Sequence, residues 1–217
     1  MRGSLLIKSF CEAAGAATIT SIALISDDLT NSLLSKSFLI GLTITTLIHC
    51  FGRISGAHFN PAVSCYLFSK KLMSKFELIA YIISQILGST LVVIGFRASS
   101  ISINEINIDK SINISSTLVT EFLFTSFLLI LISSWAREGK LCPISQPLTG
   151  IVIGAGASIF IILAEFFGSG ILNPAISIGL AIKDGPILMI PQILSQFAAV
   201  LFIKIIFYFV PEKLLEN

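Results

Sequence analysis

Six long apolar stretches constrain the fold of this sequence more than any other feature. They lie at about 5–26, 34–52, 76–97, 117–136, 146–167 and 187–210. Each is long enough to span a membrane, because a helix needs about 20 mostly apolar residues to cross a hydrocarbon core of about 30 Å. The stretches are continuous, whereas the strands of a membrane β-barrel alternate over about ten residues. The sequence therefore predicts an all-α, multi-pass integral membrane protein.

Composition excludes most soluble classes of protein. Of the 217 residues, 12% are charged and 54% are hydrophobic, and the mean hydropathy is +0.94. A soluble domain has about 25% charged residues, so this chain could not cover a globule with polar surface. The net charge is +2 and no basic run is present. We therefore expect membrane lipid, and no nucleic acid, as a partner.

Cysteine and histidine form no pattern typical of a metal or catalytic site. The four cysteines are widely separated: Cys11, Cys50, Cys65 and Cys142. This spacing argues against both a disulfide framework and a zinc site. Two histidines, His49 and His58, are available for acid–base work. We expect no metal, no cofactor and no enzymatic activity.

Lysine and arginine are distributed unequally between the two sides of the predicted membrane. When both termini are placed in the cytoplasm, ten of these residues lie inside and four outside. The inner set is Arg2, Lys8, Arg53, Lys70, Lys71, Lys75, Arg137, Lys140, Lys204 and Lys213. The outer set is Lys36, Arg97, Lys110 and Lys183. Basic residues accumulate on the cytoplasmic side, so we predict cytoplasmic termini in a plasma (inner) membrane.

Two further segments, 53–70 and 168–185, are too long and too apolar for ordinary loops. Both contain Asn-Pro-Ala, as Asn60-Pro61-Ala62 and as Asn173-Pro174-Ala175. Asn is a favourable N-cap, and Pro suits the first helical turn because its missing N–H would be unpaired there anyway. Each tripeptide opens an apolar run of about nine residues, which gives a helix of about 14 Å, or roughly half a membrane.

The two halves of the chain repeat one another. The spacing from Glu12 to Asn60 is nearly the same as the spacing from Glu121 to Asn173. Each half contributes three spans, and because three is odd the halves must run in opposite directions. We therefore predict one domain over 1–217 that consists of inverted repeats, at about 1–110 and 111–217. Broken helices at matching positions in such repeats indicate a site near the membrane midplane.

Two half-helices that enter from opposite faces would meet at their N-termini. Each N-terminus carries unpaired N–H groups and roughly half a positive charge. We expect the side chains of Asn60 and Asn173 to direct amide donors at this junction. A neutral polar molecule could exchange part of its hydration there, whereas a cation would meet the positive potential of two helices. This arrangement favours conduction of neutral solutes over ions.

The stretch Ser55-Gly56-Ala57-His58-Phe59-Asn60-Pro61-Ala62-Val63 resembles the first signature of the aquaporin and aquaglyceroporin family. The second Asn-Pro-Ala, the two early glutamates and the six spans are similar as well. The resemblance implies a right-handed bundle of six transmembrane helices with two re-entrant half-helices. It also implies a homotetramer with one pore per subunit. The expected function is passive passage of water or small uncharged solutes.

Glu12 and Glu121 require partners, because a carboxylate at the centre of a spanning helix costs about 2.5–3.5 kcal/mol. The resemblance implies that each braces a re-entrant loop by accepting hydrogen bonds from it. The alternative is a pair of proton-relay acids. For Glu165, we weigh a place at the outer mouth of the pore against a solvated span end. His58 is expected to be structural within its loop.

The predicted selectivity filter departs from the family pattern. Most members place Arg three residues after the second Asn, where this chain has Ile176. Alignment by the motifs puts Ile40, Ile161 and Gly170 at the other three filter positions. No side chain of this set can donate a hydrogen bond. Such an apolar constriction is either open to solutes that shed water readily or closed by dewetting.

The nature of the solute is less constrained than the architecture. Ser177 resembles water-conducting members and Pro186-Ile187 resembles glycerol-conducting ones. Between about Gly168 and Ile182, the chain is similar to bacterial members that are associated with arsenite passage. Two alternatives to a channel stay open at this point. They are a secondary transporter with inverted repeats and a midplane site, and a structural role with a closed pore.

Overall fold

The computed structural model describes residues 4–99, 113–135 and 148–209. Within these ranges the chain forms eight helices: α1 (Leu5–Leu29), α2 (Leu33–Phe51), α3 (Pro61–Ser69), α4 (Lys75–Ala98), α5 (Ile114–Trp135), α6 (Thr149–Phe167), α7 (Pro174–Asp184) and α8 (Pro186–Phe209). All except α3 and α7 are long and apolar enough to span a membrane. The six predicted spans are thus confirmed, with ends that differ by a few residues. The predicted span ends at 136, 146 and 210 lie outside the described residues.

The outer surface of the helices is apolar, as a lipid environment requires. Leu6, Phe76 and Ile187 are 80%, 79% and 74% exposed. In water, such large apolar side chains would form unfavourable patches, whereas lipid tails are a suitable solvent for them. Together with the six spans, this surface makes the chain a multi-pass integral membrane protein.

Local sequence signals begin several of the helices. The hydroxyl oxygens of Ser4 and Ser32 accept hydrogen bonds from backbone N–H groups of the first turn in α1 and α2. Ser74 and Glu77 form a capping box at the start of α4. These side chains satisfy N–H groups that would otherwise have no partner at a helix start.

The two half-helices begin at the predicted residues. Asn60 Oδ1 accepts a hydrogen bond from Ala62 N at 2.8 Å, and Asn173 Oδ1 accepts one from Ala175 N at 3.0 Å. A proline follows each asparagine at the first helical position. The helices that follow, α3 and α7, contain 9 and 11 residues, too few to cross a membrane.

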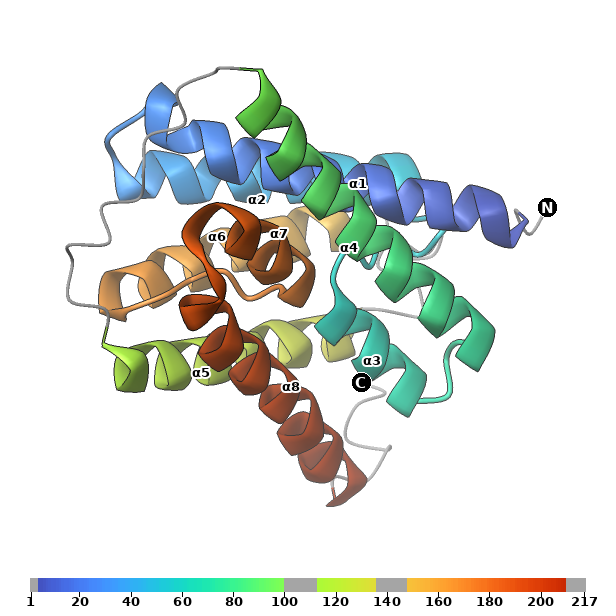
Figure 1. Ribbon diagram of the computed structural model, residues 1–217. Coiled ribbons are helices and arrows are strands. Elements are labelled where there is room, and N and C mark those ends of the chain that lie inside the picture. The colour runs from blue at the N-terminus through green and yellow to red at the C-terminus, as the bar shows by residue number, and fades with distance from the viewer. Residues whose placement is uncertain (1–3, 100–112, 136–147, 210–217) are drawn as a thin grey trace.

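The half-helices are enclosed by spans from both halves of the chain (Figure 1). Helix α3 packs against α4 and α8, and α7 packs against the same two helices. Around them, α1 pairs with α4, α5 with α8, and α2 with α6. The last pair joins the two halves directly, since α2 belongs to the first and α6 to the second.

Glycines allow α2 and α6 to approach closely. A Cβ atom at Gly41 would collide with the carbonyl oxygen of Gly154 and with the hydroxyl of Ser158, and a Cβ atom at Gly154 would collide with the side chain of Thr45. A Cβ atom at Gly150 would likewise collide with His49. Higher residue numbers on α2 thus meet lower numbers on α6, so the two helices are antiparallel.

The predicted orientation rests partly on residues outside the described ranges, namely Arg2, Lys110, Arg137, Lys140 and Lys213. Two basic residues of the described part tie helix ends together. Lys8 pairs with Glu77 at 2.6 Å, which joins the starts of α1 and α4. Arg97, near the end of α4, donates to the carbonyl oxygen of Ile182 in α7 at 2.5 Å. The membrane side on which each set lies stays a prediction.

Candidate functional site

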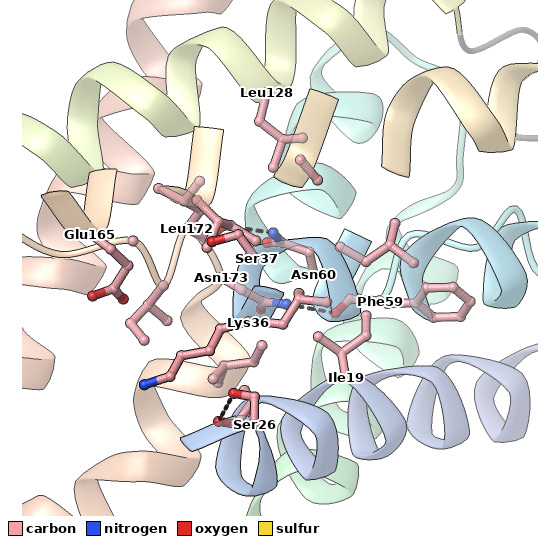
Figure 2. A pocket seen from close by; sticks show the side chains of 18 of the residues that line it. Ile19, Ser26, Lys36, Ser37, Phe59, Asn60, Leu128, Glu165, Leu172 and Asn173 are labelled. Carbon is pink, nitrogen blue, oxygen red and sulfur yellow. Dashed lines mark hydrogen bonds between the residues drawn. The ribbon is translucent and has the colours of Figure 1, made fainter. Parts of the chain in front are cut away.

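Asn60 and Asn173 each bind the loop of the opposite half. Asn60 Nδ2 donates to the carbonyl oxygen of Leu172 at 2.8 Å, and Asn173 Nδ2 donates to the carbonyl oxygen of Phe59 at 3.0 Å. Figure 2 shows these two reciprocal bonds near each other in the pocket. Each acceptor is the residue immediately before the other asparagine. The two half-helices are therefore joined at their N-termini.

Phe59 and Leu172 have left-handed backbone conformations, with φ of 51° and 52°. Such a φ costs a non-glycine residue roughly 1–2 kcal/mol. It persists only where the surrounding structure holds it. In both loops, a carboxylate on the neighbouring spanning helix supplies that support.

Glu12, on α1, receives four hydrogen bonds and is fully buried. Two come from the loop backbone, from His58 N at 3.1 Å and Phe59 N at 2.6 Å. The other two come from side chains, from Ser55 Oγ at 2.6 Å and Gln85 Nε2 at 2.8 Å. The carboxylate thus contacts the loop at the residue with the left-handed conformation.

Glu121, on α5, makes the same set of contacts in the second half and is also fully buried. It accepts from Ile171 N and Leu172 N, both at 2.9 Å. Its side-chain donors are Ser169 Oγ at 2.5 Å and Gln196 Nε2 at 2.7 Å. With four donors, the carboxylate is occupied by the protein itself and has little capacity to bind a solute.

The two glutamines of these clusters were missed by reasoning from the sequence. Gln85 also donates to Ser64 Oγ at 3.1 Å, and Gln196 to Ser177 Oγ at 3.4 Å. Each glutamine therefore connects a glutamate to the first turn of a half-helix. A repeated spacing was the available signal, because the glutamines follow the glutamates by 73 and 75 residues.

A cavity of about 540 Å³ extends along the junction. Asn60 and Asn173 both line it, with Leu128 and Leu172 close by (Figure 2). The four predicted filter residues line it as well: Ile40, Ile161, Gly170 and Ile176. The remaining Asn-Pro-Ala residues (Pro61, Ala62, Pro174 and Ala175) are buried in the first turns of α3 and α7. They are not among the described lining residues of the cavity. Their role is to form the first turns of the half-helices.

Gly170, a predicted filter residue, is closely packed against the end of α6. A Cβ atom there would lie 2.8 Å from the Ile161 carbonyl oxygen and 2.9 Å from Glu165 Cγ. Glycine is thus required by space rather than by conformation. The three isoleucines contribute aliphatic side chains without donors or acceptors. A solute that passes them must lose hydrogen bonds to water without replacement from these side chains.

Three other polar residues of interest line the same cavity: Lys36, His58 and Glu165. His58 is buried, with Nδ1 3.2 Å from Ser64 Oγ and its ring edge-on to Tyr81 at a centroid distance of 5.2 Å. Glu165 is exposed and lies at one end of the cavity with Lys36 (Figure 2). In the described part of the chain, no cluster of three His, Cys, Asp or Glu residues is placed to hold a metal ion.

Comparisons with known proteins agree with this geometry. Residues 10–186 match the family described as MIP, Major intrinsic protein. The chain is 31% identical to Aquaporin NIP2-1 of Arabidopsis thaliana over 154 residues, which are 67% of this chain and 52% of that protein. It is 30% identical to Nodulin-26 of Glycine max over 148 residues, 67% of this chain and 53% of that protein. The chain thus spans about half the length of these plant relatives.

A bacterial relative and a solved structure extend the comparison. Glycerol uptake facilitator protein-like 6 of Lactiplantibacillus plantarum is 29% identical over 152 residues, 67% of this chain and 68% of that protein. The X-ray structure of the aquaglyceroporin from Plasmodium falciparum superposes with a TM-score of 0.68 at 21% identity, and it covers 93% of this chain and 95% of that one. The structural match shows the fold, and the family match covers most of the chain. This protein therefore belongs to the major intrinsic protein family.

Proposed function

We propose that this protein is a passive channel for water and small uncharged solutes. The observation that carries the proposal is the pair of half-helices whose capping asparagines, Asn60 and Asn173, line one cavity at their junction. The proposal includes a homotetramer with one pore per chain, in the plasma (inner) membrane with both termini cytoplasmic. It also treats the halves as inverted repeats within one domain, which the matched contacts of Glu12 and Glu121 support.

The junction suits neutral polar solutes for an electrostatic reason. The positive ends of two helix dipoles meet at the cavity wall and disfavour cations. One hydrogen of each Asn amide is used by the opposite loop. Since the amide has two donor hydrogens, the second one on each side can serve a passing water or hydroxyl group.

The isoleucine-lined constriction favours solutes that shed water easily. Ile40, Ile161 and Ile176 offer no side-chain donors, so charged and strongly hydrated species lose the most on passage. Uncharged solutes such as glycerol, urea or arsenous acid lose less than ions do, because dehydrating a neutral polar group costs less than dehydrating a charge. Two of the similar proteins are named a glycerol uptake facilitator and an aquaglyceroporin, which supports glycerol-like molecules among these solutes.

In the proposed channel, Glu12 and Glu121 brace the loops rather than relay protons. Their oxygens already accept four hydrogen bonds each from the protein. The alternative of a secondary transporter would need a site for a coupling ion. Among the described lining residues, the one carboxylate is that of Glu165, at the end of the cavity. This gives the transporter little support, and we propose no enzymatic activity.

The experiment is stopped-flow swelling of proteoliposomes with water, glycerol, urea and arsenous acid. Ile176→Arg introduces a longer side chain with five donors, so the ratio of bulky-solute to water permeability should fall. Asn60→Asp and Asn173→Asp place a carboxylate at the meeting helix ends and should raise cation leak. Saturable, ion-dependent uptake would favour the transporter. If all three variants match the wild type at equal protein density, these residues do not line a pore.

A further inference from the structure

Two oppositely charged side chains lie at one end of the cavity in the described part of the chain. Among the lining residues that the structure describes, Lys36 and Glu165 are the two with a permanent formal charge near neutral pH. Lys36 lies four residues before Ile40 on α2, and Glu165 lies four residues after Ile161 on α6. Four residues are about one helical turn, or roughly 6 Å, along the same helix face. Each charge is thus one turn away from a predicted filter residue.

The antiparallel register of α2 and α6 brings these two turns together. The pairs Gly41 with Ser158 and His49 with Gly150 show that the start of α2 lies beside the end of α6. Lys36 is in the first turn of α2 and Glu165 is in the last turn of α6. Figure 2 shows both side chains at the same end of the cavity, with Asn60 and Asn173 deeper inside.

Glu165 is in direct contact with the filter. Its Cγ and backbone nitrogen lie 2.9 Å and 3.1 Å from the position that a Cβ atom at Gly170 would occupy. The side chain that carries the charge is therefore packed against Gly170, a predicted filter residue. Lys36 reaches the mouth from the neighbouring helix α2, and its long side chain extends toward the same end as the carboxylate (Figure 2).

We infer that Lys36 and Glu165 set the charge selectivity of the pore, as an opposed pair one helical turn outside an uncharged filter. This inference rests on the proposed channel function. The predicted filter has no charged side chain, so fixed charges beside it act on approaching ions in addition to the helix dipoles at the junction. Lys36 disfavours cations and attracts anions, whereas Glu165 does the reverse, so together they favour neither sign of ion, and an uncharged solute is little affected. Removing one charge should open the mouth to ions of the sign that it repelled.

The effect should be measurable. A unit charge about 6–8 Å from a passing ion changes its local concentration by about threefold at the dielectric constant of water, and by tens of fold at the lower values typical of protein surfaces. Other charges near the mouth would shift the absolute permeabilities. They would not change the direction in which each single substitution moves the cation-to-anion ratio.

The test uses three planar molecules of similar size: guanidinium, urea and nitrate. They carry a positive charge, no charge and a negative charge, so charge is the main variable. Their fluxes into proteoliposomes are divided by the water flux of the same vesicles. The variants are Lys36→Met, Glu165→Gln and the double substitution. Lys36→Arg keeps the charge, and Lys75→Met removes a charge from an exposed helix start outside the cavity lining.

Lys36→Met should raise the guanidinium-to-nitrate ratio by about threefold or more, and Glu165→Gln should lower it by a similar factor. The double variant should lie between them. Lys36→Arg should keep the guanidinium-to-nitrate ratio because it keeps the charge, whatever its effect on water flux, and Lys75→Met should match the wild type. Unchanged ratios, with normal water flux and normal elution on size exclusion, would overturn the inference and leave the channel intact. A wild-type protein that passes no water and no urea would overturn the proposed function, and the inference with it.

Discussion

The two re-entrant loops differ in length but make the same hydrogen bonds to a buried glutamate. In the first loop, four residues separate Ser55 from Asn60, whereas three separate Ser169 from Asn173. In both loops the serine hydroxyl and the two backbone N–H groups before the asparagine donate to a buried glutamate. What the halves share is therefore a set of hydrogen bonds rather than a loop length.

The extra residue of the first loop is absorbed by left-handed backbone. Gly56 has φ of 98° and Ala57 has φ of 57°, and Ala57 N donates to Ser55 Oγ at 3.1 Å. The second loop has one left-handed residue, Leu172. The comparison shows that both loops hold one position fixed, that of Phe59 or Leu172 hydrogen-bonded to its glutamate. The residues before that position adopt whatever conformation reaches it.

The surroundings of the loops also differ. Tyr81 donates to the Ser55 carbonyl oxygen at 2.5 Å, whereas Gln192 donates to Ser169 Oγ at 3.1 Å. In the first half, Lys8 and Glu77 add a salt bridge between α1 and α4. Four residues before the second glutamate, the position that corresponds to Lys8 is Thr117. The two halves thus share the buried hydrogen bonds to the glutamates. They differ in the further contacts that surround each loop.

The largest loss of stability should come from replacing the two buried glutamates that hold the loops. Glu12→Ala and Glu121→Ala should each lower the free energy of unfolding by about 3–5 kcal/mol, because each leaves four donors without their acceptor. Unfolding in mixed micelles with increasing denaturing detergent measures this loss. Glu→Gln should be milder, since its carbonyl oxygen can still accept. A large loss for one alanine variant beside a small loss for the other would break the equivalence of the two clusters.

The next effect concerns the bonds between the loops. Asn60→Ala and Asn173→Ala should each cost about 2–3 kcal/mol, from a lost N-cap of about 1 kcal/mol and an unpaired buried carbonyl. The double variant should cost less than the sum, because both bonds close the same junction. Ser74→Ala, a cap far from the junction, should cost about 1 kcal/mol and leave solute flux unchanged. Strict additivity would show that the two asparagines act independently.

A smaller effect should distinguish the two loop glycines. Gly56→Ala should cost about 1–2 kcal/mol through its left-handed φ, with little change in solute selectivity. Gly170→Ala should instead alter the ratio of glycerol to water flux, because its Cβ atom would press on the Ile161 carbonyl oxygen and on Glu165, beside the predicted filter. Stability and flux are measured on the same preparations. A change in the flux ratio for Gly56→Ala would mean that the longer loop also shapes the path.

The smallest effect should come from the added salt bridge. The side chains of Lys8 and Glu77 are 19% and 28% exposed. An ion pair near the surface contributes little to stability, so Lys8→Met should lower the free energy of unfolding by less than about 1 kcal/mol. Glu77→Ala should cost more, since it also removes the capping box of α4. Equal losses in the micelle unfolding assay would show that the salt bridge, and not the cap, carries the contribution of Glu77.

The sequence by itself determined the six spans and the two half-helices. These features are local along the chain. Hydropathy over about 20 residues predicts a span, and an asparagine followed by proline predicts a helix start. The two glutamates could be named in advance because they lie at similar distances before those starts, and the filter positions because the family resemblance implied them.

Only the tertiary structure decided which groups meet. Asn60 bonds to a carbonyl 112 residues away, and Asn173 to one 114 residues away. The roles of Gln85 and Gln196 depend in the same way on the packing of α4 and α8 against the half-helices. Lys36 and Glu165 share the mouth of the cavity because α2 and α6 are antiparallel and closely packed. A hydrogen bond or an electrostatic field depends on distance in space, and the order of residues along the chain does not contain that distance.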